Sequence, residues 1–135
     1  MKREILFRGK RKNGQWVYGS LVVSENIDPA IYYEVGNGLV KQLDWCYVSP
    51  ETIGQYTGRK DKNRVKIFEG DIVIIGEKLK AKVVYYDGAF RMQSEFSPTP
   101  TDTTDMGYMM REFSVRIIGN IHDNPELLKG GSDEA

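Results

Sequence analysis

Apolar and polar residues alternate with a period of two along most of the chain, which is the pattern of strands buried on one face. The alternating runs are short and are separated by clusters of glycine, proline, asparagine and aspartate, the residues that favour turns. No long run shows the spacing of three and four residues that an amphipathic helix needs. We therefore predict a mainly β, antiparallel fold with little helix.

A first hairpin is predicted over residues 4–23, with its turn at Asn13-Gly14. This dipeptide favours a type I′ turn, in which both central residues have positive φ. Outward pairing from such a turn sets the register, and the predicted pairs are Arg11 with Trp16, Gly9 with Tyr18 and Phe7 with Ser20. One face then carries Phe7, Trp16 and Tyr18, and the other carries Val17 together with the cations Arg8 and Lys10.

A second hairpin is predicted over residues 79–96, with Asp87-Gly88 as its turn. Outward pairing places Tyr85 opposite Phe90 and Val83 opposite Met92. All four side chains share one uniformly apolar face, so we predict that this face belongs to the core.

Between the hairpins, residues 31–35 read as a strand, residues 36–38 as a turn and residues 39–48 as the return strand. Apolar side chains occupy alternate positions of the return strand, and these are Leu39, Leu43, Trp45 and Tyr47. The alternation predicts a half-buried antiparallel strand. The strand at residues 31–35 is a candidate edge at which two copies pair.

Residues 53–58 are strand-like, residues 59–64 form a cationic loop, and Glu69-Gly70-Asp71 is predicted to turn the chain into a strand at 72–75. We expect Gly70 to adopt a backbone conformation that other residues avoid. We expect Asp71 to accept hydrogen bonds from backbone donors of the same turn. These residues and Gly58 are interpreted as structural.

The C-terminal third contains one more strand, over residues 114–121. Residues 97–107 are predicted to form an exposed loop, and residues 108–113 fit either a helical turn or a strand. Asn124 is a good N-cap and Pro125 a good first helical residue, so a short helical turn is predicted at 125–129.

The length of 135 residues fits a single domain. We predict one compact β domain over residues 1–129, followed by a disordered tail over residues 130–135. Cys46 is the only cysteine, so no disulfide can form within the chain, which suits a reducing cytoplasm. No stretch approaches the roughly 18 apolar residues of a membrane span, so no membrane association is expected.

Nineteen basic and nineteen acidic side chains cancel, which argues against a surface built wholly for DNA or an anionic membrane. The basic residues nevertheless gather in segments 2–12 and 59–66, and the end of the chain from residue 123 to 134 is acidic. Two interpretations fit this distribution. One is a solvated β surface with charged turns, and the other is a basic face that meets phosphate or an acidic partner.

The chain resembles the YopX family of phage and prophage proteins. The resemblance rests on five motifs, which are REILFR (3–8), IGQYTG (53–58), DKN (61–63), IFEGDIV (67–73) and IGNIHDNPELL (118–128). It implies a small β-barrel-like fold with SH3-like parts and an origin in a phage or prophage of a bacterial host. It implies no catalytic residue, substrate or cofactor.

The residues do not favour catalysis. His122 is the only histidine, no nucleophile-elbow pattern is present, and zinc sites usually need three or four cysteine and histidine ligands. We predict no catalytic residue, no metal and no cofactor. A magnesium site is the weaker alternative, because turn chemistry already explains most of its candidate ligands, which are Asp44, Glu69, Asp71 and Asp87.

The favoured function is a non-enzymatic module that contacts other copies of itself or a host or phage protein. The alternative is a nucleic-acid-binding module, in which aromatic rings stack on bases beside a basic groove. The candidate contacts for nucleic acid or an acidic partner are Arg8, Lys10, Arg11, Arg59, Lys60, Lys62, Arg64, Lys66 and Tyr56. Further aromatic candidates are Trp16, Tyr32, Tyr33 and Tyr86.

Overall fold

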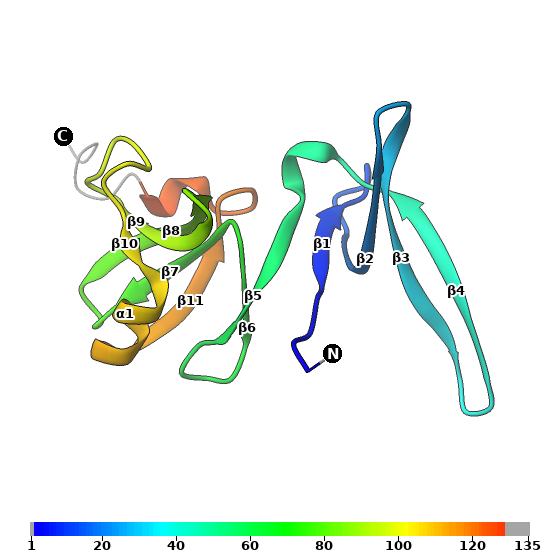
Figure 1. Cartoon of the computed structure of the whole chain (residues 1–135), viewed down its shortest axis with the longest axis horizontal. Coiled ribbons are helices and arrows are strands. Elements are labelled where there is room, and N and C mark those ends of the chain that lie inside the picture. The colour runs from blue at the N-terminus through cyan, green and yellow to red at the C-terminus, as the bar shows by residue number, and fades with distance from the viewer. Residues whose placement is uncertain (1, 129–135) are drawn as a thin grey trace. The chain divides into compact units, whose positions relative to one another are not determined.

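The computed structural model describes residues 2–128 and divides the chain into two compact units, with the boundary between Gly58 and Arg59. Each unit has its own apolar core. Within the described residues the fold is mainly β, with two antiparallel sheets and one α-helix, as predicted (Figure 1). The single domain over 1–129 stays a prediction, and the tail over 130–135 lies outside the described residues.

The first unit is built on antiparallel strands in the order β4-β3-β2-β1-β5. The strands are β1 (Phe7–Lys10), β2 (Trp16–Ser24), β3 (Ile27–Asn37), β4 (Val40–Tyr47) and β5 (Gly54–Lys60). A short 3₁₀ helix, η1 (Pro50–Thr52), connects β4 to β5. The end of β5 belongs to the second unit, and β6 (Lys66–Phe68) follows it in the strand order.

The predicted register of the first hairpin is wrong by one residue. Lys10 lies opposite Trp16, and Arg8 lies opposite Tyr18. The turn is not type I′, because Gly14 has a φ of +89° whereas Asn13 does not have positive φ. The N–H of Gly14 donates to the C=O of Arg11 (2.9 Å), which closes a three-residue loop with one more residue than predicted.

The extra loop residue exchanges the two faces of β1 relative to those of β2. Arg8 and Lys10 therefore share a face with Trp16 and Tyr18, instead of lying among the apolar side chains behind them. Val17 on the opposite face is buried in the core of the first unit.

The core of the first unit lies on one side of the β2-β3-β4 sheet. Its buried members are Val17, Ile31 and Val48, and the partly buried side chains around them are Leu21, Tyr33, Cys46 and Ile53. Cys46 is the β4 residue in this group, so the even positions of β4 face the core. The apolar odd positions, predicted to be the buried half of the strand, face away from it and are exposed.

The second unit contains a five-stranded sheet in the order β10-β9-β8-β7-β11. Its elements are β7 (Asp71–Ile75), β8 (Leu79–Tyr86), β9 (Ala89–Ser94), β10 (Thr104–Asp105), α1 (Met106–Glu112) and β11 (Val115–Asn120). The core residues are Ile67, Val73, Ile75, Ala81, Val83, Met92, Met106 and Val115.

The second hairpin has the predicted register, with Tyr85 opposite Phe90 and Val83 opposite Met92. Its two-residue turn has positive φ at both positions, +53° at Asp87 and +78° at Gly88, as a type I′ turn requires. Val83 and Met92 are buried in the core, as predicted, and Phe90 is partly buried against it. The prediction is wrong for Tyr85, which is 56% exposed near the turn.

The turn at Glu69-Gly70-Asp71 also forms as predicted. Gly70 has a φ of +95°, and the buried carboxylate of Asp71 accepts a hydrogen bond from the N–H of Phe68 (2.7 Å). This bond fixes the entrance to β7, which contributes Val73 and Ile75 to the second unit's core.

Residues 108–113, which fitted either a helical turn or a strand, belong mostly to a helix. This helix, α1, begins at Met106, within the loop predicted at 97–107. Asp105 caps the helix by accepting a hydrogen bond from the N–H of Tyr108 (2.9 Å). Near the end of the described residues, residues 125–128 form a 3₁₀ turn. The side chain of Asn124, just before this turn, accepts a hydrogen bond from the N–H of Asn120 (3.2 Å). No helix among residues 2–128 is long and apolar enough to cross a membrane.

Candidate interaction surfaces

The residues predicted to contact a partner fall into two groups, one in each unit. Arg8, Lys10, Arg11 and Tyr56 belong to the first unit, whereas residues 59–66 belong to the second.

The cations of the first unit already contact aromatic rings of the same unit. The guanidinium of Arg8 lies 4.6 Å from the ring centroid of Trp16, and Nζ of Lys10 lies 5.4 Å from it. Arg11 donates a hydrogen bond to the hydroxyl of Tyr33 (2.7 Å). Arg8 is only 5% exposed and therefore acts mainly within the fold, whereas Lys10 and Arg11 are partly exposed.

Tyr56 is also buried, with 7% of its surface exposed, and its N–H donates to the C=O of Leu6 (2.8 Å). Little of its ring is accessible for stacking on a base.

The cationic segment of the second unit is exposed but ordered. Arg59 and Lys60 lie at the end of β5, rather than in the predicted loop. Lys62 and Arg64 lie in the turn that follows, and Lys66 opens β6 and is partly buried. Gly58 precedes the segment with a φ of +89°.

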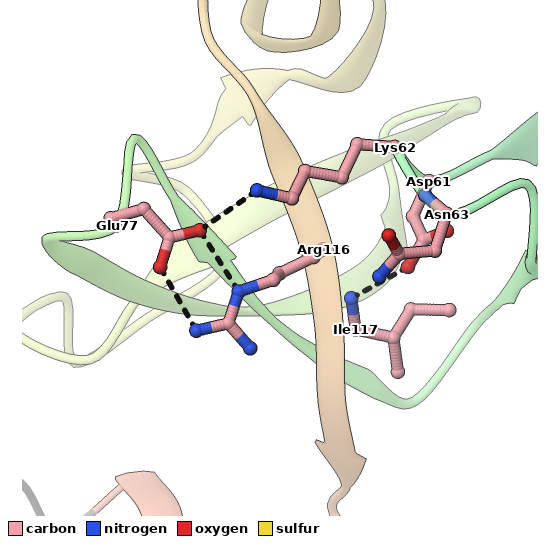
Figure 2. A network of polar contacts seen from close by, with 6 residues as sticks. All are labelled: Asp61, Lys62, Asn63, Glu77, Arg116 and Ile117. Atoms are coloured by element: carbon pink, nitrogen blue, oxygen red, sulfur yellow. Dashed lines mark hydrogen bonds and ion pairs between the residues drawn. The ribbon is translucent and has the colours of Figure 1, made fainter.

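The carboxylate of Asp61 holds this turn in place (Figure 2). Its Oδ1 accepts hydrogen bonds from the N–H groups of Asn63 and Val65 (both 2.9 Å), and its Oδ2 accepts one from the N–H of Ile117 (3.0 Å). The N–H of Lys62 donates to the C=O of Val115 (2.9 Å). The turn is therefore fastened to β11, and Asp61 is 6% exposed although it lies among cations.

A charged cluster lies next to this turn (Figure 2). Arg116 binds Glu77 through two hydrogen bonds of 2.9 Å, from Nε to Oε2 and from Nη2 to Oε1. Nζ of Lys62 lies 3.4 Å from Oε2 of the same carboxylate. The hydrogen bond from Arg116 is the main reason that the pKa of Glu77 falls from 4.5 to about 2. One cation of the loop, Lys62, therefore already has an internal partner in Glu77.

The first unit has a different kind of surface on the side of its sheet that faces away from the core. We call the exposed side chains of Val22, Leu43, Trp45 and Tyr47, together with the partly buried Tyr32, the outer aromatic face. Trp45 stacks on Tyr32 at a centroid distance of 6.1 Å and meets Tyr47 edge-on at 5.0 Å. Leu43, Trp45 and Tyr47 are 69%, 44% and 50% exposed. A shallow groove of about 220 Å³ adjoins the rings and is lined by Val22, Ser24, Ile27, Asp28, Ala30, Tyr32, Trp45 and Tyr47.

An open sheet edge adjoins this face. Among the described strands β4 pairs only with β3, and Figure 1 shows it at the edge of the first unit's strands. The expectation that residues 31–35 form an edge is wrong, because β3 lies between β2 and β4. On β4, the N–H of Trp45 donates to the side chain of its neighbour Asp44 (2.8 Å) and not to another strand, as expected for a donor that points to an open edge.

Three of the four carboxylates considered for magnesium have local roles in their turns or strands. Asp71 bonds within its turn, Asp87 occupies a positive-φ turn position, and Asp44 bonds the N–H of Trp45. Within residues 2–128 no three histidine, cysteine, aspartate or glutamate side chains gather as metal ligands would.

The family model described as YopX protein matches residues 6–129. The chain belongs to the YopX family. The resemblance drawn from the sequence motifs is therefore confirmed over nearly the whole chain. No curated protein matches it. The structure of this YopX protein is similar to the crystal structure of protein EF1440 from Enterococcus faecalis, with a TM-score of 0.60 and 26% sequence identity. The match covers 93% of this chain and 98% of that chain.

Replacing Asp61 should destabilise the second unit. Asp61→Ala leaves three backbone N–H groups without their acceptor, and we expect the free energy of unfolding to fall by about 2 kcal/mol or more. Urea denaturation measures the change. Asp102→Ala, at an exposed loop position, is the matched control, and equal stability of the two variants would contradict a fastening role for Asp61.

The Glu77 cluster should make stability depend on pH in the acid range. Because the pKa of Glu77 is lower in the folded protein, its ionised form stabilises the fold above about pH 4.5, and this contribution disappears as the pH falls toward 2. Unfolding curves of wild type and Glu77→Gln should therefore differ at neutral pH and converge in acid. The exposed Glu112→Gln is the control, and parallel curves for Glu77→Gln would count against the cluster.

Proposed function

We propose that this YopX protein is a non-enzymatic protein-interaction module of phage or prophage origin that acts in the bacterial cytoplasm. The observation that carries the proposal is the outer aromatic face of the first unit beside the open edge of β4. The YopX family resemblance supports the phage origin, and the single cysteine is compatible with a reducing compartment.

The composition of this face is that of a protein interface. Tyrosine and tryptophan are enriched among the residues that contribute most of the binding energy at interfaces, because they bury a large area and lose little conformational entropy. The adjoining edge offers backbone donors and acceptors, which add affinity when a partner strand extends a sheet. One partner can engage both features together.

In this proposal the second unit is the SH3-like, barrel-like part that the resemblance implied. Its support is the set of five antiparallel strands around one apolar core. Asp61 and the Glu77 cluster stabilise this unit without making it a site.

Nucleic-acid binding is the second candidate function. The observation in its favour is that Arg59, Lys60 and Arg64 are exposed on a segment whose turn is fastened by Asp61. Because the backbone of this turn is already ordered, it loses little conformational entropy when its side chains meet phosphate. It ranks second because Tyr56 is buried and Lys62 contacts Glu77.

Removal of the aromatic side chains should strongly reduce partner capture. We expect tagged Trp45→Ala/Tyr47→Ala protein to recover at least about tenfold less partner from a host lysate than wild type, since each such ring commonly contributes over 1 kcal/mol. Tyr85→Ala/Tyr86→Ala is the matched control, because it removes two exposed tyrosines of the second unit. Quantitative mass spectrometry of the captured proteins gives the readout, and identical recovery by all three proteins would overturn the proposal.

The nucleic-acid alternative predicts a salt-dependent affinity for labelled single-stranded DNA. Each lost phosphate contact should reduce the slope of log affinity against log salt concentration by about 0.7. Fluorescence anisotropy should then show a shallower slope for Arg59→Ala/Lys60→Ala/Arg64→Ala than for the control Lys12→Ala/Lys78→Ala. Absence of binding by wild type at low salt would eliminate this function.

A further inference from the structure

We infer that the open edge of β4 pairs antiparallel with β4 of a second copy of this chain, on a two-fold axis at Leu43. This inference rests on the proposed function, because it names the partner of the same surface. The first units of the two chains then form one continuous sheet.

The backbone groups that such a pairing needs are available on β4. The N–H of Val48 donates to the C=O of Pro29 (3.1 Å), in continuation of the β3–β4 register. Because the bonds of an antiparallel ladder alternate, the even positions of β4 direct their N–H and C=O groups to β3. The groups of Lys41, Leu43 and Trp45 therefore point to the open edge, which agrees with the bond from the Trp45 N–H to its neighbour's carboxylate.

Two-fold symmetry leaves few registers for this pairing. Opposed residues of two antiparallel copies lie on the same face of the sheet, so the axis must pass through a residue of the strand. An axis at Lys41 would oppose two lysines, and an axis at Asp44 would oppose two aspartates, which is unfavourable. Axes at Gln42 or Trp45 would pair only residues 40–44 or 43–47, whereas an axis at Leu43 pairs residues 40–46.

The Leu43 register also joins complementary side chains. It brings the two Leu43 side chains together and sets Lys41 of each copy opposite Trp45 of the other, where the ammonium can contact the face of the indole. It sets the Gln42 amide opposite the Asp44 carboxylate. When the strands pair, the Asp44 carboxylate gives up its hydrogen bond from the Trp45 N–H. It can then accept one from the Gln42 amide of the second copy.

The tip of the hairpin fits the same arrangement. Leu39 is fully exposed at 104% and lies in the turn between β3 and β4. In the Leu43 register, the second copy's Leu39 lies opposite Tyr47, which lines the shallow groove. The two outer aromatic faces then become one surface, and the most exposed apolar side chain of the first unit acquires an apolar neighbour.

A disulfide tests this register directly, because the chain has a single native cysteine. The axis at Leu43 sets position 40 opposite Cys46 as a non-hydrogen-bonded pair, with Cα atoms about 4.5 Å apart, which a disulfide can bridge. Within one chain the same positions are about 20 Å apart along β4, so no internal disulfide can form. Val40→Cys should therefore become a covalent dimer in a glutathione redox buffer, as seen on a non-reducing gel.

Two control variants test whether the cross-link is specific to the register with its axis at Leu43. Val40→Cys/Cys46→Ser should stay monomeric on the gel, because equivalent positions 40 lie far apart in this register. Gln42→Cys/Cys46→Ser should also stay monomeric, and an efficient cross-link there would move the axis to Gln42 and overturn the inference.

Light scattering separates this inference from the proposed function. Wild type should have twice the mass of one chain, and Leu43→Lys, which opposes two cations at the axis, should have the mass of a monomer with an unchanged circular dichroism spectrum. A wild type that is monomeric at high concentration overturns the second-copy inference. If that monomer still captures a partner through Trp45 and Tyr47, the proposed function stands.

Discussion

Side chains of a β-strand alternate strictly between two faces, and most of this structure follows from that constraint. A single extra residue in the loop at Gly14 decides that Arg8 and Lys10 lie beside Trp16 and not behind it. The same alternation turns Cys46 toward the core and leaves Trp45 and Tyr47 in solvent. The register of each strand pair therefore determines which residues are available to a partner.

The mainly β class and the second hairpin were predictable, because the information for them is local. Asp87-Gly88 favours a type I′ turn, and the apolar positions on both sides agree with the register that this turn imposes. Asn13-Gly14 carries the same signal, but there glycine alone takes the positive φ and the loop has three residues. Two similar dipeptides thus give different registers, since the choice depends on how the flanking strands pack.

The exposed face of β4 was not predictable from its own alternation. An amphipathic strand normally turns its apolar side inward, but the register with β3 sets Cys46 opposite the buried Ile31, so the even positions of β4 face the core. The bond between Asp61 and Ile117 spans 56 positions of the chain, so no local pattern announces it. Among the cations, Arg8 contacts Trp16 and Lys62 contacts Glu77, and both contacts depend on tertiary structure. The number of basic residues in the sequence therefore overstates the positive charge available to a ligand.

The hydrogen bond from the N–H of Trp45 to the side chain of Asp44 gives the exposed edge a selectivity of its own. A strand that docks there must offer a carbonyl to that N–H and also solvate the carboxylate that it displaces, since a buried and unbonded carboxylate is costly. Generic apolar strands, including those of partly unfolded chains, meet only the first condition. An exposed edge strand that would otherwise invite aggregation is in this way protected by one short acidic side chain, without the loss of its aromatic surface.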